Sequence, residues 1–271
     1  MSMKRLSLVA SCMAALMAAQ PASAGYQENL IQSDSKWDVM LGVTAATVAE
    51  YPGAEDQEFI GLPAIVVDYE FRENNHLYIN TLQDSGSDFM KGAGYEFNGE
   101  RIIWGIKAGW RKGREQGDSE KLIDLGDVDS TFTAGFYGGL HFGPLRLLAE
   151  YDAGLDNNND GVLTTFSARY NMVSVDKPMS GFIGVKTVYG DDAYQDAYFG
   201  VDTPRVGRPA YEADAGFVKY GVFGGIDYLL ADHHYFRLDG NYMSLSTDVT
   251  NSSVVEENYD FGAFVSYGYK F

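Results

Sequence analysis

The end of the chain carries a strict two-residue alternation of side-chain type. From position 259 onward every odd position is apolar or aromatic: Tyr259, Phe261, Ala263, Val265, Tyr267, Tyr269 and Phe271. The even positions are small or polar apart from one phenylalanine: Asp260, Gly262, Phe264, Ser266, Gly268 and Lys270. Because side chains alternate between the two faces of a strand, this segment predicts a strand with one apolar and one polar face. Such a strand fits a wall between lipid and a polar lumen.

The terminal phenylalanine adds a second signal. An alternating, tyrosine-rich strand that ends on Phe271 resembles the closing strand of bacterial outer-membrane β-barrels. The resemblance implies that Tyr267, Tyr269 and Phe271 form the insertion signal read by the barrel-assembly machinery. The predicted fold is therefore all-β, a transmembrane antiparallel up-and-down β-barrel. We expect it in the outer membrane of a Gram-negative bacterium, in contact with lipid and lipopolysaccharide.

The start of the chain predicts export. Lys4 and Arg5 precede an apolar run over residues 6–19, and small residues follow up to Ala24, as in a secretory signal peptide. An alternative is a lipoprotein processing box that ends at Cys12, but few apolar residues would then precede the cleavage point. No later run approaches the roughly 20 apolar residues that a membrane-spanning helix needs.

The sequence thus predicts three regions. Residues 1–24 form a cleaved signal peptide, residues 25–35 a periplasmic N-terminal segment, and residues 36–271 an outer-membrane β-barrel. Cleavage after Ala24 would remove Cys12, the only cysteine, so the mature chain would contain no disulfide.

Period-two alternation recurs along the chain and predicts about 12 strands, with 10 or 14 as alternatives. The predicted strands are 37–47, 58–71, 76–83, 88–97, 101–112, 130–142, 145–153, 162–173, 179–189, 217–229, 234–247 and 257–271. Every second connection is short and turn-like, at 72–75, 98–99, 143–144, 176–178 and 231–233. The other connections are mostly longer, acidic and irregular, especially 113–129 and 190–216. This rhythm is typical of a barrel with both termini in the periplasm.

The acidic composition argues against nucleic acid as a partner. The formal net charge is −18, which argues against nucleic acid because phosphates require a basic surface. Most of the acidic residues fall in the predicted external loops. Acidic loops would attract cations in a salt-dependent way. The alternative is that the negative charge only keeps the loops soluble and neighbouring molecules apart.

Charged residues also occupy the predicted lumen face. They are Lys107, Arg111, Arg146, Glu150, Arg169, Lys186, Lys219, Arg237 and Asp239. Buried charges of mixed sign must pair or stay hydrated. The preferred interpretation is a structural ladder that fills the barrel, since small barrels are often filled by their own side chains. The alternative is a constriction with a basic stripe of Lys107, Arg111, Arg169 and Lys186, suited to small anionic solutes.

The sequence does not predict an enzyme or a cofactor. The only histidines are His76, His141, His233 and His234, and no serine in a recognisable nucleophile setting accompanies them. A hydrolase would need a base and a nucleophile within hydrogen-bond reach.

A metal site is a weaker hypothesis. Asp156, Asn158, Asp160 and Gly161 match the start of an EF-hand loop. The twelfth position, which requires a bidentate glutamate, is Ser167, so the EF-hand interpretation fails. A loose divalent-cation site formed by Asp152, Asp156 and Asp160 outside the membrane is the remaining alternative to a solvated acidic hairpin loop.

Several short motifs suggest a family. They are Tyr51-Pro52-Gly53, Leu62-Pro63, the loop from Gly113 to Val128, Phe142-Gly143-Pro144, and Tyr198-Phe199-Gly200-Val201 followed by Tyr211. In this order, and with Phe271 at the end, they look like the MltA-interacting protein (MipA/OmpV) family over essentially the whole mature chain. The resemblance implies an outer-membrane protein and brings no agreed catalytic residues. The name-giving member is described as a scaffold that joins a lytic transglycosylase to a peptidoglycan synthase, and other members as porin-like or adhesive.

The functional expectation is therefore a non-enzymatic barrel at the cell envelope. The leading hypothesis is a structural or scaffolding role linked to a murein hydrolase and synthase complex. The alternatives are a narrow passive porin-like channel for small solutes and a surface adhesin.

Overall fold

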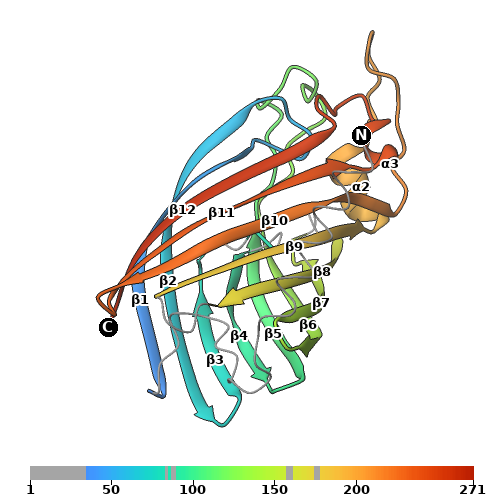
Figure 1. The fold of residues 1–271 in the computed structure, drawn as a ribbon. Coiled ribbons are helices and arrows are strands. Elements are labelled where there is room, and N and C mark those ends of the chain that lie inside the picture. Colours follow the sequence, from blue (N-terminus) through green and yellow to red (C-terminus); the bar gives the residue numbers. More distant parts are fainter. Residues whose placement is uncertain (1–34, 83–84, 87–89, 157–160, 174–177) are drawn as a thin grey trace, which may run out of the picture.

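Twelve antiparallel strands form a closed barrel in sequence order, which confirms the predicted fold class (Figure 1). The computed structural model describes residues 35–82, 85–86, 90–156, 161–173 and 178–271. The predicted signal peptide and nearly all of the predicted N-terminal segment lie outside the described residues. In β4 and β8, which border undescribed segments, the side chains at 90, 91 and 173 are likewise not described.

The strands follow one another around the wall, and β1 closes the barrel on β12. Their bounds are β1 Trp37–Ala49, β2 Gln57–Arg72, β3 Asn75–Asn80, β4 Met90–Asn98, β5 Ile102–Arg111, β6 Thr131–Phe142, β7 Leu145–Gly154, β8 Val162–Val173, β9 Met179–Gly190, β10 Gly216–Leu230, β11 His234–Leu245 and β12 Tyr259–Lys270. Two short helices, α2 (Asp192–Phe199) and α3 (Thr247–Thr250), lie in the long loops. Among the described residues, no helix is long and apolar enough to span a membrane.

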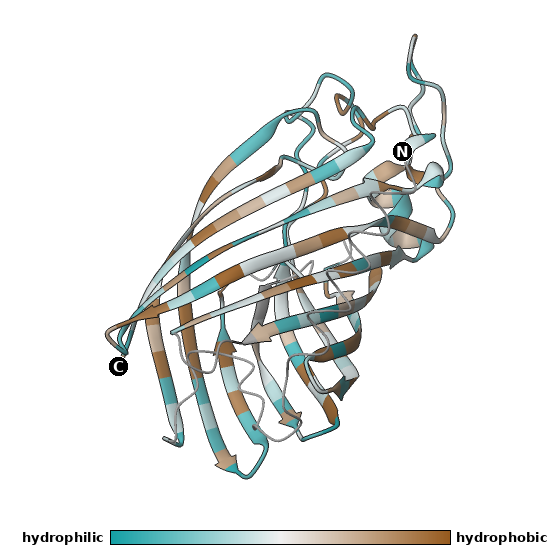
Figure 2. Cartoon of the chain, in the orientation of Figure 1, coloured by the Kyte–Doolittle hydropathy of each residue, from teal (hydrophilic) through white to brown (hydrophobic). Residues whose placement is uncertain are grey.

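The two-residue alternation separates the two faces of the wall. On β12, Phe261 and Val265 face outward and are exposed, whereas Phe264 and Ser266 face the lumen and are buried. On β5, Ile106 is 58% exposed and its neighbour Lys107 only 4%. Hydrophobic and hydrophilic residues accordingly alternate along the strands in Figure 2. The barrel therefore presents an apolar outer surface and a mixed polar interior.

The two ends of the barrel differ. One end, the turn end, carries the short hairpin turns and Phe271, and the other, the loop end, carries the long connections. Aromatic rings line the wall near the turn end: Trp37 stacks on Tyr69 with ring centres 4.3 Å apart, and Tyr95 lies 5.3 Å from Trp104. Rings in this position are typical of the interfacial girdles of membrane barrels.

The connection between β3 and β4 differs from expectation. β3 ends at Asn80 rather than near residue 83, and Leu82 packs inside the barrel against a cluster that includes Met40, Val66 and Tyr235. The Ser85 backbone N–H donates to Asp239 Oδ1 on β11 at 3.0 Å. The described part of this connection therefore lies in the lumen, not in an external loop. Leu82 turns inward because it covers apolar side chains of β1 and β2 that would otherwise face water in the lumen.

Candidate functional site

Lys107 on β5 joins two carboxylates of β7 inside the barrel. Its Nζ lies 3.0 Å from Glu150 Oε1 and 2.9 Å from Asp152 Oδ2, and no side chain of the three is more than 3% exposed. The intervening strand β6 leaves room with Gly135, which is opposite both Lys107 and Asp152 in register. A Cβ at Gly135 would lie 2.7 Å from Asp152 Oδ1. The ion-paired set thus stabilises three neighbouring strands.

Arg111 lies closer to the loop end of β5 and bonds backbone carbonyls. Its guanidinium donates to Gly161 O at 2.7 Å and to Asp152 O at 3.1 Å. The same group lies 5.4 Å from the centre of the Tyr194 ring. Lys107 and Arg111, two of the four cations of the hypothetical basic stripe, are therefore engaged by protein groups.

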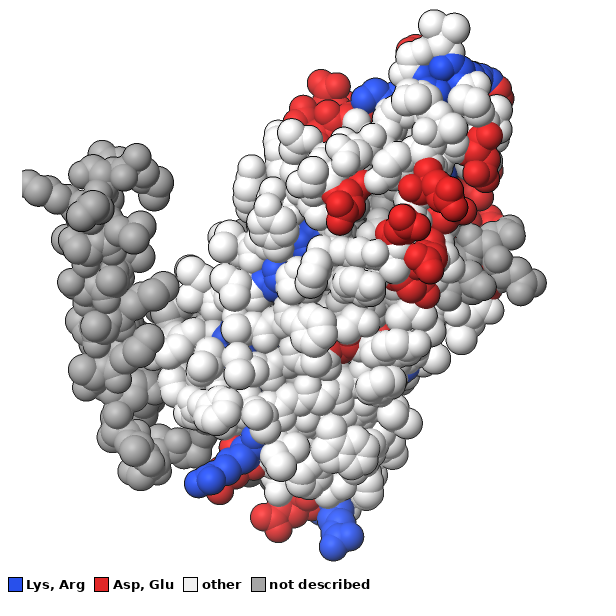
Figure 3. Space-filling view, turned by 90° about the vertical axis from the view of Figure 1, so that its right-hand side faces the viewer, with Lys and Arg blue, Asp and Glu red and all other residues white. Residues whose placement is uncertain are grey.

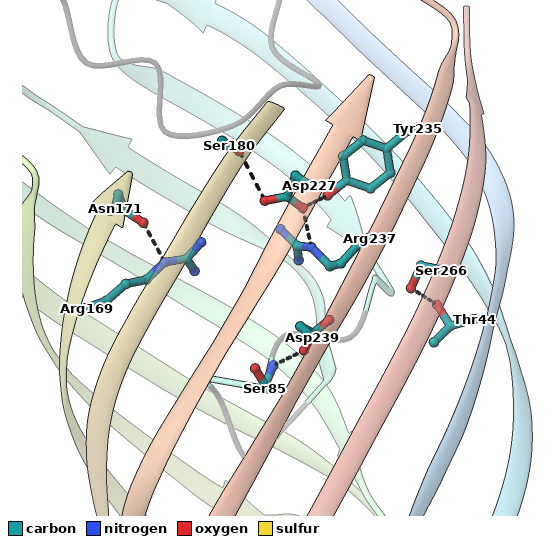
Figure 4. A network of polar contacts seen from close by, with 10 residues as sticks. All are labelled: Thr44, Ser85, Arg169, Asn171, Ser180, Asp227, Tyr235, Arg237, Asp239 and Ser266. Atoms are coloured by element: carbon teal, nitrogen blue, oxygen red, sulfur yellow. Dashed lines mark hydrogen bonds and ion pairs between the residues drawn. The ribbon is translucent and has the colours of Figure 1, made fainter. Parts of the chain in front are cut away.

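A second polar cluster lines the lumen along β9, β10 and β11 (Figure 4). Asp227 on β10 accepts hydrogen bonds from Arg237 Nε at 2.6 Å and from the Tyr235 hydroxyl. Ser180 Oγ donates to the other carboxylate oxygen at 3.3 Å. All these residues are buried, so the cluster holds β9, β10 and β11 together.

Arg169 on β8 extends this cluster. Its Nε donates to Asn171 Oδ1 at 2.7 Å, and its guanidinium lies 3.8 Å from the centre of the Phe182 ring. Arg237 lies 5.6 Å from the same ring. The guanidinium groups therefore use an aromatic face as well as polar partners.

The remaining predicted lumen residues also lie on the inner face of the wall. Lys219 Nζ is 3.5 Å from Asp260 Oδ2, and Asp239 accepts the bond from Ser85. Arg146 of β7 is directly opposite Arg169 of β8, and Lys186 of β9 is opposite Ser167 of β8. Arg146, Arg169 and Lys186 are thus three cations on neighbouring strands. Like charges that face each other across two strands destabilise the sheet unless nearby acceptors or anions offset the repulsion.

The long loops bury an apolar core of their own over the loop end. We call this core the loop cap; it consists of Tyr51, Ala54, Leu122, Val128, Tyr194, Tyr198, Phe199, Val201, Ala213, Val249 and Val254. It packs against the lumen-facing ends of β8 to β11, at Leu163, Val188, Val218 and Leu245. Four loops therefore meet across the mouth of the barrel.

Hydrogen bonds join the loops of the cap. The Tyr198 hydroxyl donates to Lys112 O at 2.7 Å, and Ser252 Oγ donates to Phe199 O at 2.6 Å. Buried Arg208 donates to the carbonyls of Lys121 and Ile123 at 2.8 and 2.7 Å. These bonds tie the loops to one another, so the loop cap is an ordered cover rather than the irregular loops expected.

Glu256 is a hydrogen-bond centre at the edge of the cap. Its carboxylate accepts from the Tyr51 hydroxyl at 3.0 Å, from Ser119 Oγ at 2.8 Å and from Glu55 N–H at 3.3 Å. Burial by itself would raise the pKa of the Glu256 carboxyl, but these bonds, together with the nearby Lys121 ammonium, lower it. The charged form of Glu256 thus links three loops.

Acidification is expected to loosen the loop cap through Glu256. Folding lowers the pKa of Glu256, so the ionised carboxylate stabilises the folded loops. This stabilisation is complete above the ordinary glutamate pKa of about 4.3 and is lost as the pH falls through the lower pKa of the folded state. Each lost hydrogen bond is worth about 1 kcal/mol. Limited proteolysis of the loops should therefore accelerate at acidic pH in the wild type. The Glu256→Gln variant should be cut faster at neutral pH and show a weaker pH dependence, and equal behaviour of the two proteins would contradict this role.

Acidic side chains gather on the surface at the loop end (Figure 3). The exposed acids around α2 and α3 include Asp192, Asp196, Asp202, Glu212, Asp214 and Asp248. Burial, and then repulsion from Asp202 and Glu212, raises the pKa of Asp196. The negative charge expected in the long loops is therefore present at their surface.

The hypothetical metal ligands do not converge. Asp152 faces the lumen and pairs with Lys107, whereas Asp156 is exposed in the following loop, and Asp160 lies outside the described residues. The reason is strand parity: Asp152 is opposite Gly135 on the inner face of β7. No group of three His, Cys, Asp or Glu side chains within the described ranges could hold a metal ion.

Three of the histidines contact a carboxylate, a backbone carbonyl and a tyrosine hydroxyl. His76 Nδ1 lies 2.7 Å from Asp68 Oδ1, His233 Nδ1 lies 2.9 Å from Lys270 O, and His234 Nδ1 lies 3.0 Å from the Tyr267 hydroxyl. His141 lies on the lumen side of β6, opposite Arg146. None of these three contacts pairs a histidine with a serine, threonine or cysteine side chain.

Comparison with known proteins decides the family. Residues 41–271 match the family described as MltA-interacting protein MipA. The chain belongs to this family. No curated protein shows a significant match to the chain. Family membership and the barrel place the protein in the outer membrane of a Gram-negative bacterium, so the apolar outward face is the lipid face.

Solved structures show only a general barrel likeness. The COG4313 outer membrane channel from Pseudomonas putida F1 aligns with a TM-score of 0.49 and 11% identity, covering 92% of this chain and 100% of that chain. OmpT of Vibrio cholerae aligns with a TM-score of 0.36 and 10% identity, covering 89% and 100%. At these values the matches imply no shared activity.

The predicted insertion signal lies on the lipid face of the closing strand. Tyr267 and Tyr269 are partly exposed, and the Phe271 side chain is 69% exposed. The Phe271 backbone N–H donates to Val39 O at 3.0 Å, which ties the last residue to β1. The signal residues are thus part of the seam that closes the barrel.

Deletion of Phe271 is expected to lower the amount of barrel in the outer membrane. The missing residue removes both the terminal aromatic group and its bond to β1. Heat-modifiable migration of outer-membrane fractions in gels measures the folded protein. Phe261→Ala, which removes another lipid-facing phenylalanine of β12, is the matched control and should cause the smaller loss; an equal loss would show that Phe271 carries no special signal.

The loop cap was missed by the sequence reasoning. A usable signal was present, because Tyr194 and Tyr198 are spaced by one helical turn and stack with ring centres 4.5 Å apart. Aromatic residues at helical spacing inside an acidic loop indicate a buried helix face rather than a solvated loop.

Proposed function

We propose that this protein is a closed, non-enzymatic barrel with a structural role at the cell envelope, which holds a murein-processing partner at the inner surface of the outer membrane. The observation that carries the proposal is the loop cap, since an apolar core across the mouth opposes free diffusion through the barrel. The paired charges around Lys107 and Asp227 support the same conclusion because they fill and rigidify the lumen.

The partner follows from the family description. MltA-interacting proteins are named for a partner, and the earlier expectation is a murein hydrolase and synthase complex. Such enzymes act on the periplasmic side, which the turn end would face. Exposed charges of both signs lie there, among them Arg72, Glu73, Glu100, Arg101 and Asp232 (Figure 3 shows charges at this end). Short turns offer a small interface, so we expect weak or transient binding.

Affinity capture tests the scaffold. A tag inserted between Val206 and Gly207, at the exposed tip of the β9–β10 loop, leaves the turn end free. Capture from detergent-solubilised envelopes should recover a murein hydrolase or synthase. The double variant Arg72→Glu and Arg101→Glu should lose it, whereas Glu212→Lys at the loop end should not. Recovery of no murein enzyme, or equal recovery from both variants, would contradict the scaffold.

A narrow channel is the second candidate, favoured by the three neighbouring cations Arg146, Arg169 and Lys186. If the lumen conducts, the wild-type barrel in planar bilayers should give steady steps with anion preference, and Lys186→Glu should reduce that preference. If the barrel is closed as we propose, the wild type should give no steady steps.

A further inference from the structure

A fully buried hydroxyl on β6 has no hydrogen-bond partner. Thr133 faces the lumen and is 0% exposed, and no described residue bonds its Oγ1. A buried hydroxyl that makes no hydrogen bond carries the cost of its removal from water without any return. Native structures therefore give nearly all such groups a partner, either a protein atom or an ordered water.

Two cations of β5 cross β6 on either side of Thr133. Lys107 Nζ lies 2.9 Å from Asp152 Oδ2 on β7, and Arg111 donates to Asp152 O at 3.1 Å. Thr133 is opposite Gly109, the residue midway between Lys107 and Arg111 on β5. The threonine hydroxyl therefore lies between the two cationic bridges, with the Asp152 side chain diagonally across from it on β7.

The inward positions next to Thr133 include three glycines. Gly109 on β5 and Gly154 on β7 are its direct neighbours across the sheet, and Gly135 is the next inward residue of β6 toward the turn end. The Asp152 carboxylate extends over Gly135, since a Cβ built there would lie 2.7 Å from Asp152 Oδ1. The wall thus places no side chain directly beside the hydroxyl, and a carboxylate oxygen lies over the next inward position.

The same carboxylate oxygen is a second atom without a partner. Asp152 is 0% exposed, and its Oδ1 accepts no hydrogen bond within the described part of the chain, from Thr133 or from any other residue. A carboxylate oxygen only accepts, whereas a hydroxyl both donates and accepts. One small molecule that donates to Asp152 Oδ1 and bonds the Thr133 hydroxyl would satisfy both groups.

The charges around this position select a neutral molecule. Lys107 and Arg111 supply two positive charges, and Glu150 and Asp152 supply two negative ones. An anion would face the Asp152 carboxylate, and a cation would lie between the lysine and the arginine. Water is neutral, donates two hydrogen bonds and accepts two, and commonly occupies buried polar sites of this kind.

We propose that the lumen binds an ordered water molecule between Thr133 and Asp152, which donates to Asp152 Oδ1 and hydrogen-bonds the Thr133 hydroxyl. The water completes the hydrogen bonds of a charge set that is already paired, and it does not replace the ammonium group of Lys107. The lumen is thus hydrated at a fixed position between β6 and β7, and this hydration requires no conducting path through the barrel.

The sign of a stability change tests the proposal. Thr133→Val keeps the shape of the side chain and removes the hydroxyl. If the hydroxyl holds a water, this change takes a partner from that water and should lower the urea midpoint of unfolding in detergent micelles. If the hydroxyl is dry, the same change removes an unsatisfied group and raises the midpoint, which would overturn the proposal. Thr164→Val, on the lipid face of β8, is the matched control and should not lower the midpoint.

A crystal structure of the barrel gives the direct readout. We expect electron density for a water within hydrogen-bond distance of Thr133 Oγ1 and Asp152 Oδ1, and we expect its loss in Thr133→Val. Two ordered side chains with no density between them would contradict the proposal. An anomalous signal at this position after bromide soaking would also contradict it, because the ligand would then be an anion.

A second pair of variants covers the case in which Thr133→Val does not show the gel migration of a folded barrel. Thr133→Ser keeps the hydroxyl, and Thr133→Ala removes it. Serine should give the higher urea midpoint if the hydroxyl binds water. A higher midpoint for alanine would show that the hydroxyl is dry and would overturn the proposal.

Discussion

Replacing Lys107 with methionine is expected to lower the free energy of unfolding by about 3–5 kcal/mol, the cost of breaking a buried ion pair from one side. Glu150 and Asp152 would remain in the lumen, both buried, with the ammonium between them removed. Methionine keeps most of the side-chain volume, so lost packing contributes little. Urea titration in detergent micelles, followed by tryptophan fluorescence, measures the change.

Two controls separate charge pairing from a general effect of losing a lysine. Lys112→Met removes a lysine whose ion pair is 40% exposed, and this change should cost less than about 1 kcal/mol. Adding Glu150→Gln and Asp152→Asn to Lys107→Met should recover much of the loss because no unpaired charge remains. If Lys107→Met is no more destabilising than Lys112→Met, the lumen is hydrated enough to solvate the carboxylates, and the structural ladder is wrong.

Replacing Phe199 with alanine is expected to open the loop cap. Phe199 is 1% exposed at the end of α2, where it packs among the apolar residues of four loops. Such a truncation costs about 3–5 kcal/mol. The wall has its own strand ladders, so the loss should fall on the cap and leave the barrel folded. Planar-bilayer recordings should then show conductance steps that the wild type lacks.

The matched control is Ile123→Ala, which truncates an exposed apolar residue of the β5–β6 loop at the same end of the barrel. It should leave the wild-type recordings unchanged. Steps of equal size in the wild type and in Phe199→Ala would contradict the closed barrel on which the proposed function rests.

Much of the wall could be predicted because lipid imposes a local rule. Each residue of β5 or β12 faces either hydrocarbon or the lumen, so the parity of Ile106 and Lys107 can be inferred from their neighbours. The same parity places Asp152 inside the barrel, whereas the hypothetical divalent-cation site had grouped it with the loop residues Asp156 and Asp160. The end of β3 was misplaced because Leu82 has the parity of the inward-facing Tyr78 and so fits an inner position of a longer strand. In the structure the strand ends at Asn80, and Leu82 reaches the interior from the connection that follows.

The pairing of the lumen charges could not be predicted. Lys107 reaches Asp152 across β6 only because Gly135 leaves the space, and that depends on the register of three strands. The helical spacing of Tyr194 and Tyr198 could indicate one buried helix face, but it could not predict how the loop cap assembles, since Tyr51 and Val254 meet from loops at opposite ends of the chain. Contacts of such long range carry no periodic signal.

The bond from the Tyr51 hydroxyl to Val254 O, at 3.1 Å, spans 203 residues. Val254 lies just before β12, the strand that seals the seam with β1. The cover over the mouth therefore cannot be completed until the final hairpin has been delivered, and a nascent barrel must stay uncovered throughout its assembly. We therefore expect the mouth to close no earlier than the arrival of the strand that seals the wall.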